Sequence, residues 1–267
     1  CSFVQKSINM KQVIGIIPAR YQSSRFPGKP LVDIKGKSMI RRVVEQCEKS
    51  KRLTKIVVAT DDKRIYDHVL EFGGMAMMTG DFHQSGTERC GEVVEKLEQK
   101  GEYFDVVVNI QGDEPFISPA HIDKVCDILL NDDQAEIGTL AKRISSSSEL
   151  FNENVVKVVL TEGEMNGEPR DALYFSRHPI PFVRGKEESL WLEHAEYFKH
   201  IGIYGFNIDE FYEIQSIEHS MLERAESLEN LRWLSHHFTI QVSEIEEDII
   251  GIDTPQDLEK ILNSDNF

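Results

Sequence analysis

The sequence predicts an α/β fold in which a mixed, mostly parallel, doubly wound sheet carries helices on both faces. In the first half, short apolar runs recur at regular intervals, and patterns with helical spacing lie between them. This alternation is typical of parallel strands joined by helical crossovers. After about residue 135 the rhythm changes, because strand-like segments follow one another without a long helix between them. The second half is therefore expected to be mixed.

The first half is expected to alternate strands and helices. Its apolar, largely β-branched runs predict strands at 13–17, 55–60, 74–80 and 105–110. Helical patterns occupy 38–50, 61–74 and 87–101, and a further helix is expected to begin at 118. Ser38 is a typical N-cap residue, a glycine closes the second helix, and Ser118-Pro119 supplies a cap and a first helical turn.

The second half adds strands, an arm and two helices. Strand-like segments lie at 136–144, 154–163, 170–176, 199–208 and 238–245. Asn166-Gly167 is a hairpin-turn signal. One helix is expected from about Met221 to His236, and a last one from Pro255. A small antiparallel arm, inserted around 165–198, is expected within a single domain of residues 10–267. Residues 1–9 are interpreted as an N-terminal extension.

Composition narrows the class of protein. The formal net charge is −16, with 40% hydrophobic and 28% charged residues, which fits a soluble globular chain. Such a chain repels nucleic acid and anionic lipid unless it focuses positive charge locally. No apolar run approaches the ~20 residues of a membrane span. Four widely spaced cysteines without a C-x-x-C pair fit a cytoplasmic protein, and Cys47 and Cys126, which lie among apolar residues on helical patterns, are expected to be buried free thiols.

The stretch IIPARYQSSRFPGKPL, from Ile16 to Leu31, follows the first predicted strand. Open α/β sheets bind ligands at this carboxyl edge. The loop has one glycine, so it is neither a G-x-G-x-x-G nor a Walker loop, and phosphate chemistry must depend on side chains. The candidate donors are two arginines, a lysine and two serines: Arg20, Arg25, Lys29, Ser23 and Ser24. The alternative is a solvated surface loop.

Two further segments place carboxylates at strand ends. Asp113 follows Gly112 after the fourth strand, and it is not needed as a helix cap because Ser118 can serve. Asp253 precedes Thr254, which can cap the last helix, although Asp253 could compete for that role. Mg²⁺ prefers one or two carboxylates together with substrate phosphates and waters. The three segments therefore predict a Mg²⁺–polyphosphate site and transfer at a nucleoside triphosphate.

At these places the sequence resembles the 3-deoxy-manno-octulosonate cytidylyltransferase (CMP-Kdo synthetase) family. The matching blocks run from about residue 13 to 262 in the family's order. They are IIPARYQSSRFPGKPL, HQSGTER (83–89), NIQGDEP (109–115), VKVVL with ALYFSR (172–177), HIGIYGF (200–206), SLENLR (227–232) and GIDTPQDL (251–258). The resemblance implies a nucleotidyltransferase-like fold and a Mg²⁺-dependent cytoplasmic homodimer. It also implies that CTP and the acid sugar Kdo give CMP-Kdo and pyrophosphate for lipopolysaccharide synthesis.

The resemblance also implies roles for individual residues. Those expected to bind the nucleotide are Pro18, Ala19, Arg20, Ser23, Arg25, Lys29, Gly86 and Arg89. Those expected to line the sugar site are Gln111, Arg177, Arg184, His200, Tyr204, Glu229 and Asn230. Asp113 and Asp253 are expected to hold Mg²⁺, and with Arg20 and Lys29 to form the catalytic set.

Structural roles stay open for several of these residues. His200 would otherwise be a solvent-facing edge histidine, Arg177 a surface ion-pair partner, and Arg89 a residue on a solvated helix face. Trp191 and Trp233 are expected to be packing residues rather than stacking platforms.

Two departures from the family pattern concern the sugar site. Asn230 replaces a usual Gln, which shortens the amide by one methylene, and Phe206 replaces a frequent Tyr, which removes a hydroxyl. The rival interpretations are a cytidylyltransferase for another acid sugar, such as a sialic or related nonulosonic acid, and a nucleotide-binding protein without catalysis.

Overall fold

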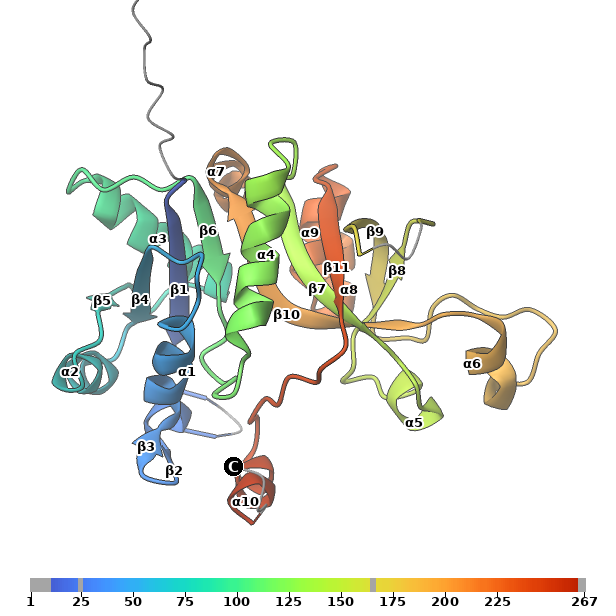
Figure 1. The fold of residues 1–267 in the computed structure, drawn as a ribbon, viewed down its shortest axis with the longest axis horizontal. Coiled ribbons are helices and arrows are strands. Elements are labelled where there is room, and N and C mark those ends of the chain that lie inside the picture. The colour runs from blue at the N-terminus through green and yellow to red at the C-terminus, as the bar shows by residue number, and fades with distance from the viewer. Residues whose placement is uncertain (1–10, 24–25, 164–166, 264–267) are drawn as a thin grey trace, which may run out of the picture.

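The computed structural model describes residues 11–23, 26–163 and 167–263. One large sheet forms the centre of the molecule (Figure 1). Its strands lie in the order β5 (Ala76–Met78), β4 (Lys55–Thr60), β1 (Val13–Ala19), β6 (Val106–Asn109), β10 (Phe198–Asn207), β7 (Ile137–Arg143), β11 (Ile240–Ile245), β9 (Arg170–Ser176) and β8 (Lys157–Leu160). The pairs β5–β4, β4–β1, β1–β6 and β7–β11 are parallel. Strand β10 runs antiparallel to β6 and β7, so the mixed, mostly parallel sheet is confirmed.

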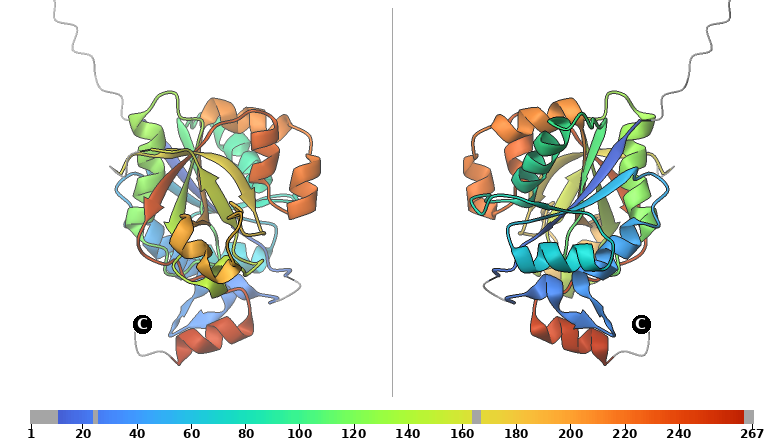
Figure 2. Two further views of the ribbon diagram at one scale, coloured as in Figure 1. Left: turned by 90° about the vertical axis from the view of Figure 1, so that its right-hand side faces the viewer. Right: turned by 90° about the vertical axis from the view of Figure 1, so that its left-hand side faces the viewer.

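Helices cover both faces of the sheet, as the edge-on views of Figure 2 show. On one face lie α1 (Met39–Cys47), α2 (Lys63–Glu71) and α4 (Pro119–Asn131). On the other lie α3 (Gly86–Glu98), α7 (Ile208–Ser216) and α9 (Asn230–Ser235). Successive residues of a strand point to opposite faces, so Ile14 and Ile16 of β1 enter the core under α3 while Val13 and Ile17 enter the core under α1. The doubly wound arrangement is therefore confirmed.

A small substructure lies below the sheet in Figure 1. It consists of the hairpin β2 (Asp33–Ile34) and β3 (Lys37–Ser38) and the last helix, α10 (Pro255–Leu262). Buried Ile34, Met39, Ile252 and Ile261 form its own apolar cluster. This cluster fixes the C-terminal helix beside the start of α1, although the two segments are far apart in sequence.

The prediction of a single helix from Met221 to His236 is wrong. The chain forms α8 (Met221–Glu226) and α9, which are separated because Ser227 has a positive φ of 53° in the left-handed region. A residue in that conformation ends a helix. Four further features were not predicted: α7, the β2–β3 hairpin and the one-turn helices α5 (Ser147–Leu150) and α6 (Trp191–His194). Short elements carry too few residues for a clear periodic signal.

The segment expected as an inserted arm contains two different structures. Strand β9 belongs to the main sheet, where it pairs antiparallel with β8 and β11. After Ser176 the chain leaves the sheet and projects through the 3-10 helix η2 (Glu188–Leu190) and α6 before it returns as β10 (Figure 1). Asn166 of the predicted hairpin turn and the extension 1–9 lie outside the described residues.

Other packing expectations are confirmed. Trp191 and Trp233 are buried core residues, at 2% and 0% exposure. Cys47, Cys90 and Cys126 are buried free thiols. None of the helices in the described part of the chain combines the length and apolar character that a membrane crossing requires.

Candidate active site

The loop after β1 curls back on itself at the carboxyl edge of the sheet. Gly28 has a φ of 73°, and its N–H donates to the carbonyl of Tyr21 at 2.8 Å. A Cβ at Gly28 would meet the Tyr21 ring at 3.2 Å, so the glycine is needed both for its backbone conformation and for space. The 3-10 turn η1 (Lys29–Leu31) follows at once and directs Lys29 back toward the sheet. Arg25 lies outside the described residues.

The two predicted metal ligands meet at this lysine. The Nζ of Lys29 lies 2.6 Å from Oδ2 of Asp113 and 3.3 Å from Oδ1 of Asp253. The Lys29 side chain is only 14% exposed. A protein cation therefore occupies the space between the two carboxylates, which shows that their arrangement is suited to a positive charge.

Backbone contacts explain why Asp113 and Asp253 converge. Gly112 lies so close to the end of β1 that a Cβ there would be 2.7 Å from the carbonyl oxygen of Pro18. The N–H of buried Ile252 donates to the carbonyl of Asp113 at 3.0 Å. Thr254 and Asp257 form a reciprocal capping box at the start of α10, so Thr254, and not Asp253, is the cap.

A third acidic residue, Glu114, directly follows Asp113. Burial, followed by the charges of Asp113 and Asp253, raises the pKa of Glu114 to about 8. No group of three or more His, Cys, Asp or Glu side chains suited to a metal gathers within the described residues. Two carboxylates fit Mg²⁺ in particular, because this ion usually keeps several waters and substrate phosphate oxygens as its other ligands.

One pocket joins the loop to Asp113. It is lined by the end of β1, the loop after it and the segment after β6: Pro18, Ala19, Arg20, Gln22, Ser23, Lys29, Pro30, Gln111, Gly112 and Asp113. A larger cavity lies between α4, β11 and the β8–β9 turn, and its lining includes His121 and Lys124 but none of the predicted site residues. The site is therefore defined by the convergence of polar groups and not by cavity size.

The arginines predicted at the nucleotide lie at different depths. Arg20 is partly exposed, and its guanidinium donates to the carbonyl of His83. Arg89 is fully buried and bonds to Thr79 and, at 3.0 Å, to Asp61. The interpretation of Arg89 as a residue on a solvated face is therefore wrong. Burial, followed by repulsion from Arg89, lowers the pKa of Arg20.

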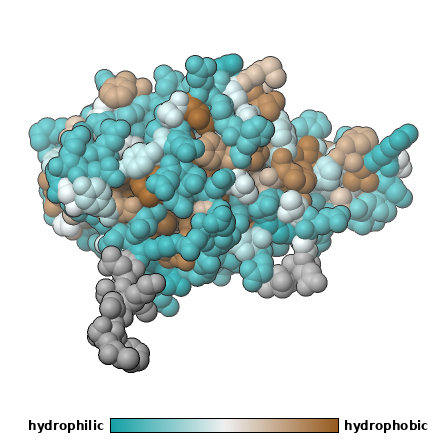
Figure 3. All heavy atoms as spheres, turned by 90° about the horizontal axis from the view of Figure 1, so that it is seen from above, coloured by the Kyte–Doolittle hydropathy of each residue, from teal (hydrophilic) through white to brown (hydrophobic). Residues whose placement is uncertain are grey.

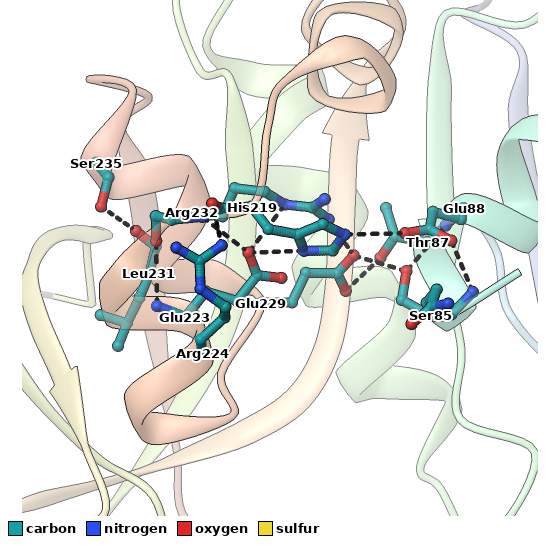
Figure 4. Close-up of polar contacts among 12 residues, drawn as sticks. Ser85, Thr87, Glu88, His219, Glu223, Arg224, Glu229, Leu231, Arg232 and Ser235 are labelled. Atoms are coloured by element: carbon teal, nitrogen blue, oxygen red, sulfur yellow. Dashed lines mark hydrogen bonds and ion pairs between the residues drawn. The ribbon is translucent and has the colours of Figure 1, made fainter.

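Glu229 links the start of α3 to the start of α9 (Figure 4). Its carboxylate accepts hydrogen bonds from Ser85 at 2.8 Å, Thr87 at 2.9 Å and Arg232 at 2.9 Å. Burial nevertheless raises the pKa of Glu229. This contact brings the segment of Gly86, expected at the nucleotide, against the segment expected at the sugar.

Ser85 and Thr87 were missed as individual site residues. The signal that could have found Ser85 is its position, because a serine immediately before a helix is a typical N-cap, and its Oγ does accept from the N–H of Glu88.

The predicted sugar residues on β10, His200 and Tyr204, form a buried polar cluster with Asn230 of α9. Asn230 is 2% exposed and donates to the hydroxyl of Tyr204 at 2.8 Å, while its own Oδ1 has no hydrogen-bond partner among the described residues. His200 lies between the rings of Phe175 and Tyr204, with Nε2 3.0 Å from Thr139 Oγ1. Burial lowers the pKa of His200 to about 3. The interpretation of His200 as a solvent-facing edge residue is therefore wrong, since β10 is an inner strand.

A bulge in β10 brings Gln111 into this cluster. The register of β10 against β7 shifts between Ile201 and Tyr204, and the carbonyl of Gly202 within the bulge accepts from Gln111 Nε2 at 2.9 Å. Bulges often redirect chain groups next to active sites. Here the bulge connects β10 to the segment that carries Asp113.

The two remaining arginines lie toward the arm. The guanidinium of Arg177 donates to the carbonyls of Glu226 at 2.7 Å and Glu153 at 3.1 Å. A sugar carboxylate would have to displace one of these bonds to be held as predicted. Arg184 is exposed in the segment that leads into η2, and no hydrogen bond connects it to the other predicted sugar residues in the described part of the chain.

Comparisons with known proteins identify the family of this chain. Residues 14–248 match the family model described as cytidylyltransferase. The 3-deoxy-manno-octulosonate cytidylyltransferase of Parabacteroides distasonis is 49% identical over 95% of this chain and 98% of the relative. That of Thermodesulfovibrio yellowstonii is 47% identical over 94% of this chain and 98% of the relative.

Solved structures extend the comparison to three dimensions. A CMP:2-keto-3-deoxy-manno-octonic acid synthetase complexed with CTP aligns with a TM-score of 0.84 and 40% identity, over 94% of this chain and 97% of that one. A cytidylyltransferase from Leptospira borgpetersenii, 16% identical with a TM-score of 0.57 over 94% of this chain and 85% of that one, shares the fold. The chain belongs to the 3-deoxy-manno-octulosonate cytidylyltransferase family.

Proposed function

We propose that the protein transfers CMP from CTP to the anomeric hydroxyl of 3-deoxy-D-manno-octulosonate (Kdo), which gives CMP-Kdo and pyrophosphate. The observation that carries the proposal is the meeting of Asp113 and Asp253 at Lys29, beside a pocket that Arg20 and Ser23 also line. The family relationship names the sugar acid, and a relative's complex with CTP names the nucleotide.

The residues of the chain account for binding and positioning. Arg20, Lys29 and Ser23 supply donors to the triphosphate, and arginine suits phosphate because its planar fork makes paired hydrogen bonds. The anomeric hydroxyl then attacks the α-phosphorus in line, and the P–O bond to pyrophosphate breaks. The cations stabilise the departing pyrophosphate charge. Catalysis then comes from positioning and electrostatics, without a protein nucleophile.

Asp113 and Asp253 would hold Mg²⁺ in this proposal. The fit is supported by the Lys29 ammonium, which stands between the two carboxylates as another cation would. When bound there, Mg²⁺ would supply Lewis-acid stabilisation of the negative charge that develops on the phosphate. Lys29 would then exchange its carboxylate partners for phosphate oxygens.

Pyrophosphate release with CTP, Mg²⁺ and a panel of acid sugars tests the proposal. Kdo is expected to give the highest kcat/KM. Faster turnover with a sialic or related nonulosonic acid would support the rival sugar specificity. CTP binding without pyrophosphate release for any sugar would support a binding protein. Omission of Mg²⁺ is expected to abolish release, and restoration by Mn²⁺ would confirm a divalent-ion requirement.

We also propose a cytoplasmic homodimer, formed through the projecting arm and serving lipopolysaccharide synthesis. The arm carries its own apolar cluster around Trp191 and Tyr197, and Phe182 is 71% exposed with its ring edge-to-face on Trp191. Figure 3 shows apolar surface on this projecting end of the molecule. Exposed apolar patches of this kind mark interaction surfaces.

A further inference from the structure

The contact between Arg20 and the carbonyl of His83 depends on a second contact behind it. The ring of His83 is only 9% exposed, and its Nε2 lies 2.5 Å from Oε2 of Glu92 on α3. The same Oε2 accepts the N–H of Gly80 at 2.8 Å. One carboxylate oxygen therefore holds both ends of the segment from Gly80 to His83, whose last carbonyl receives Arg20.

Local packing indicates that this segment has little freedom. A Cβ at Gly80 would lie 2.1 Å from the ring of Phe82, so Phe82 folds closely over the glycine. The Phe82 and His83 rings lie 4.4 Å apart between centroids. Although burial alone would raise the pKa of Glu92, hydrogen bonds from Lys96, His83 and Gly80 lower it to about 2. The carboxylate that holds the segment is therefore ionised at any working pH.

Arg20 needs such support for an electrostatic reason. Burial, followed by repulsion from the buried cation Arg89, lowers the pKa of Arg20. An arginine side chain also loses rotamer entropy when it is fixed. An acceptor that already holds the guanidinium before the nucleotide arrives reduces the ordering cost of binding.

We propose that His83 and Glu92 are positioning residues for the nucleotide: their contact fixes the His83 carbonyl, which orients Arg20 toward the triphosphate. This inference rests on the proposed function, in which Arg20 binds CTP. It assigns roles to His83, whose backbone carbonyl contacts Arg20, and to Glu92, which acts on Arg20 only through His83. It predicts that loss of the contact weakens CTP binding and leaves Kdo binding nearly unchanged.

The main variant is His83→Phe, which keeps an aromatic ring but removes the donor. We expect the CTP dissociation constant, measured by calorimetry, to rise about tenfold, and the KM for Kdo to stay within about twofold. His83→Gln restores a side-chain N–H and should recover most of the CTP affinity. If His83→Phe folds poorly, Glu92→Gln tests the same contact through its other partner. Again the CTP dissociation constant should rise while the KM for Kdo stays nearly unchanged.

Lys96→Met is the matched control. Lys96 pairs with the other oxygen of the same carboxylate, Glu92 Oε1, at 2.7 Å. Its loss should leave the CTP dissociation constant within about twofold of that of the parent protein. An effect of Lys96→Met as large as that of His83→Phe would overturn the assignment, since general loosening of α3 would then explain both.

A double-mutant cycle decides whether His83 acts through Arg20. In an Arg20→Ala background, His83→Phe should change the CTP dissociation constant by less than about twofold. The effects of substitutions at coupled residues are not additive, whereas those at independent residues are. A full tenfold effect in that background would overturn the proposal. Calorimetry requires no turnover, so this result is separate from the assay of the proposed function. A parent protein that bound CTP but released no pyrophosphate would refute the function alone.

Discussion

Asp113 and Asp253 converge on one ammonium group, the Nζ of Lys29, at 2.6 and 3.3 Å. The two aspartates follow different strands and lie far apart in the chain. A hydrogen bond from Ile252 to the Asp113 carbonyl and the apolar cluster under α10 hold them in this relation. The geometry gives a clear expectation for what happens when one or both charges are removed.

The first prediction concerns the carboxylates as a pair. Asp113→Asn and Asp253→Asn should each lower kcat/KM. Each loss should correspond to several kcal/mol of transition-state stabilisation, the scale of a metal acting as a Lewis acid. The double variant should be scarcely worse than the poorer single, because groups that act as a unit are strongly non-additive. The measurement is kcat/KM for the three variants at saturating Mg²⁺. Losses that simply add would refute a shared ion.

The second prediction concerns the lysine between them. Lys29→Met leaves two carboxylates without their internal cation, so Mn²⁺ should bind the CTP-free variant about tenfold more tightly, or about 1.4 kcal/mol. CTP should bind more weakly, because one phosphate contact is lost. Mn²⁺ titration followed by electron paramagnetic resonance measures the first effect and calorimetry the second. Unchanged or weaker Mn²⁺ binding would show that Lys29 and the metal do not share a site.

The third prediction concerns Asn230 and Tyr204, which share a buried hydrogen bond of 2.8 Å. Asn230→Leu should destabilise the fold by about 1–3 kcal/mol, since it leaves the Tyr204 hydroxyl buried and unpaired. Adding Tyr204→Phe should recover part of that stability, because replacing both partners is often nearly neutral. Denaturant unfolding of the singles and the double measures this coupling. Additive losses would mean that the bond contributes nothing. The KM for Kdo is expected to rise in each variant.

The fourth prediction concerns pH. The pKa of His200 falls from an ordinary 6.5 to about 3 on folding because of burial. Below pH 6.5 the unfolded chain therefore takes up a proton that the folded chain does not, so stability falls as the pH decreases from 6.5 toward 3. The full effect is 1.36 kcal/mol per pH unit. The His200 residue as a whole is partly exposed, so we expect less than the full effect, about 1 kcal/mol between pH 7 and pH 5.

His200→Gln removes this titration. Urea unfolding at pH 7 and pH 5 should show a loss of stability that is about 1 kcal/mol smaller in the variant than in the parent. Equal losses in the two proteins would show that the group responsible for acid sensitivity lies elsewhere.

The fifth prediction concerns assembly. Phe182→Asp places a charge on the exposed ring of the arm, so it should shift the protein from twice the chain mass of 30.6 kDa to the single chain mass. Leu70→Asp is the matched control, because Leu70 is 47% exposed on α2, away from the arm. Light scattering after gel filtration measures both. A dimer that survives Phe182→Asp would place the interface elsewhere.

Local patterns in the sequence predicted most of the fold. The run VIGII, the capped amphipathic helix after Ser38 and the box of Thr254 with Asp257 are each specified by residues within one element. The prediction of one helix from 221 to 236 was wrong because local apolar spacing does not show where the backbone breaks. The left-handed backbone at Ser227 ends α8, and α9 begins only at Asn230.

The sequence by itself determined which residue types gather in each segment: a cationic loop, two spare aspartates and a family-like set of polar residues. Tertiary structure decided how they meet. It placed Lys29 between the aspartates, buried Arg89 behind Arg20, and turned the Arg177 guanidinium toward backbone carbonyls. These outcomes depend on contacts between residues distant in the chain, and local propensity contains no information about the partner that a charged side chain finds when the elements pack together.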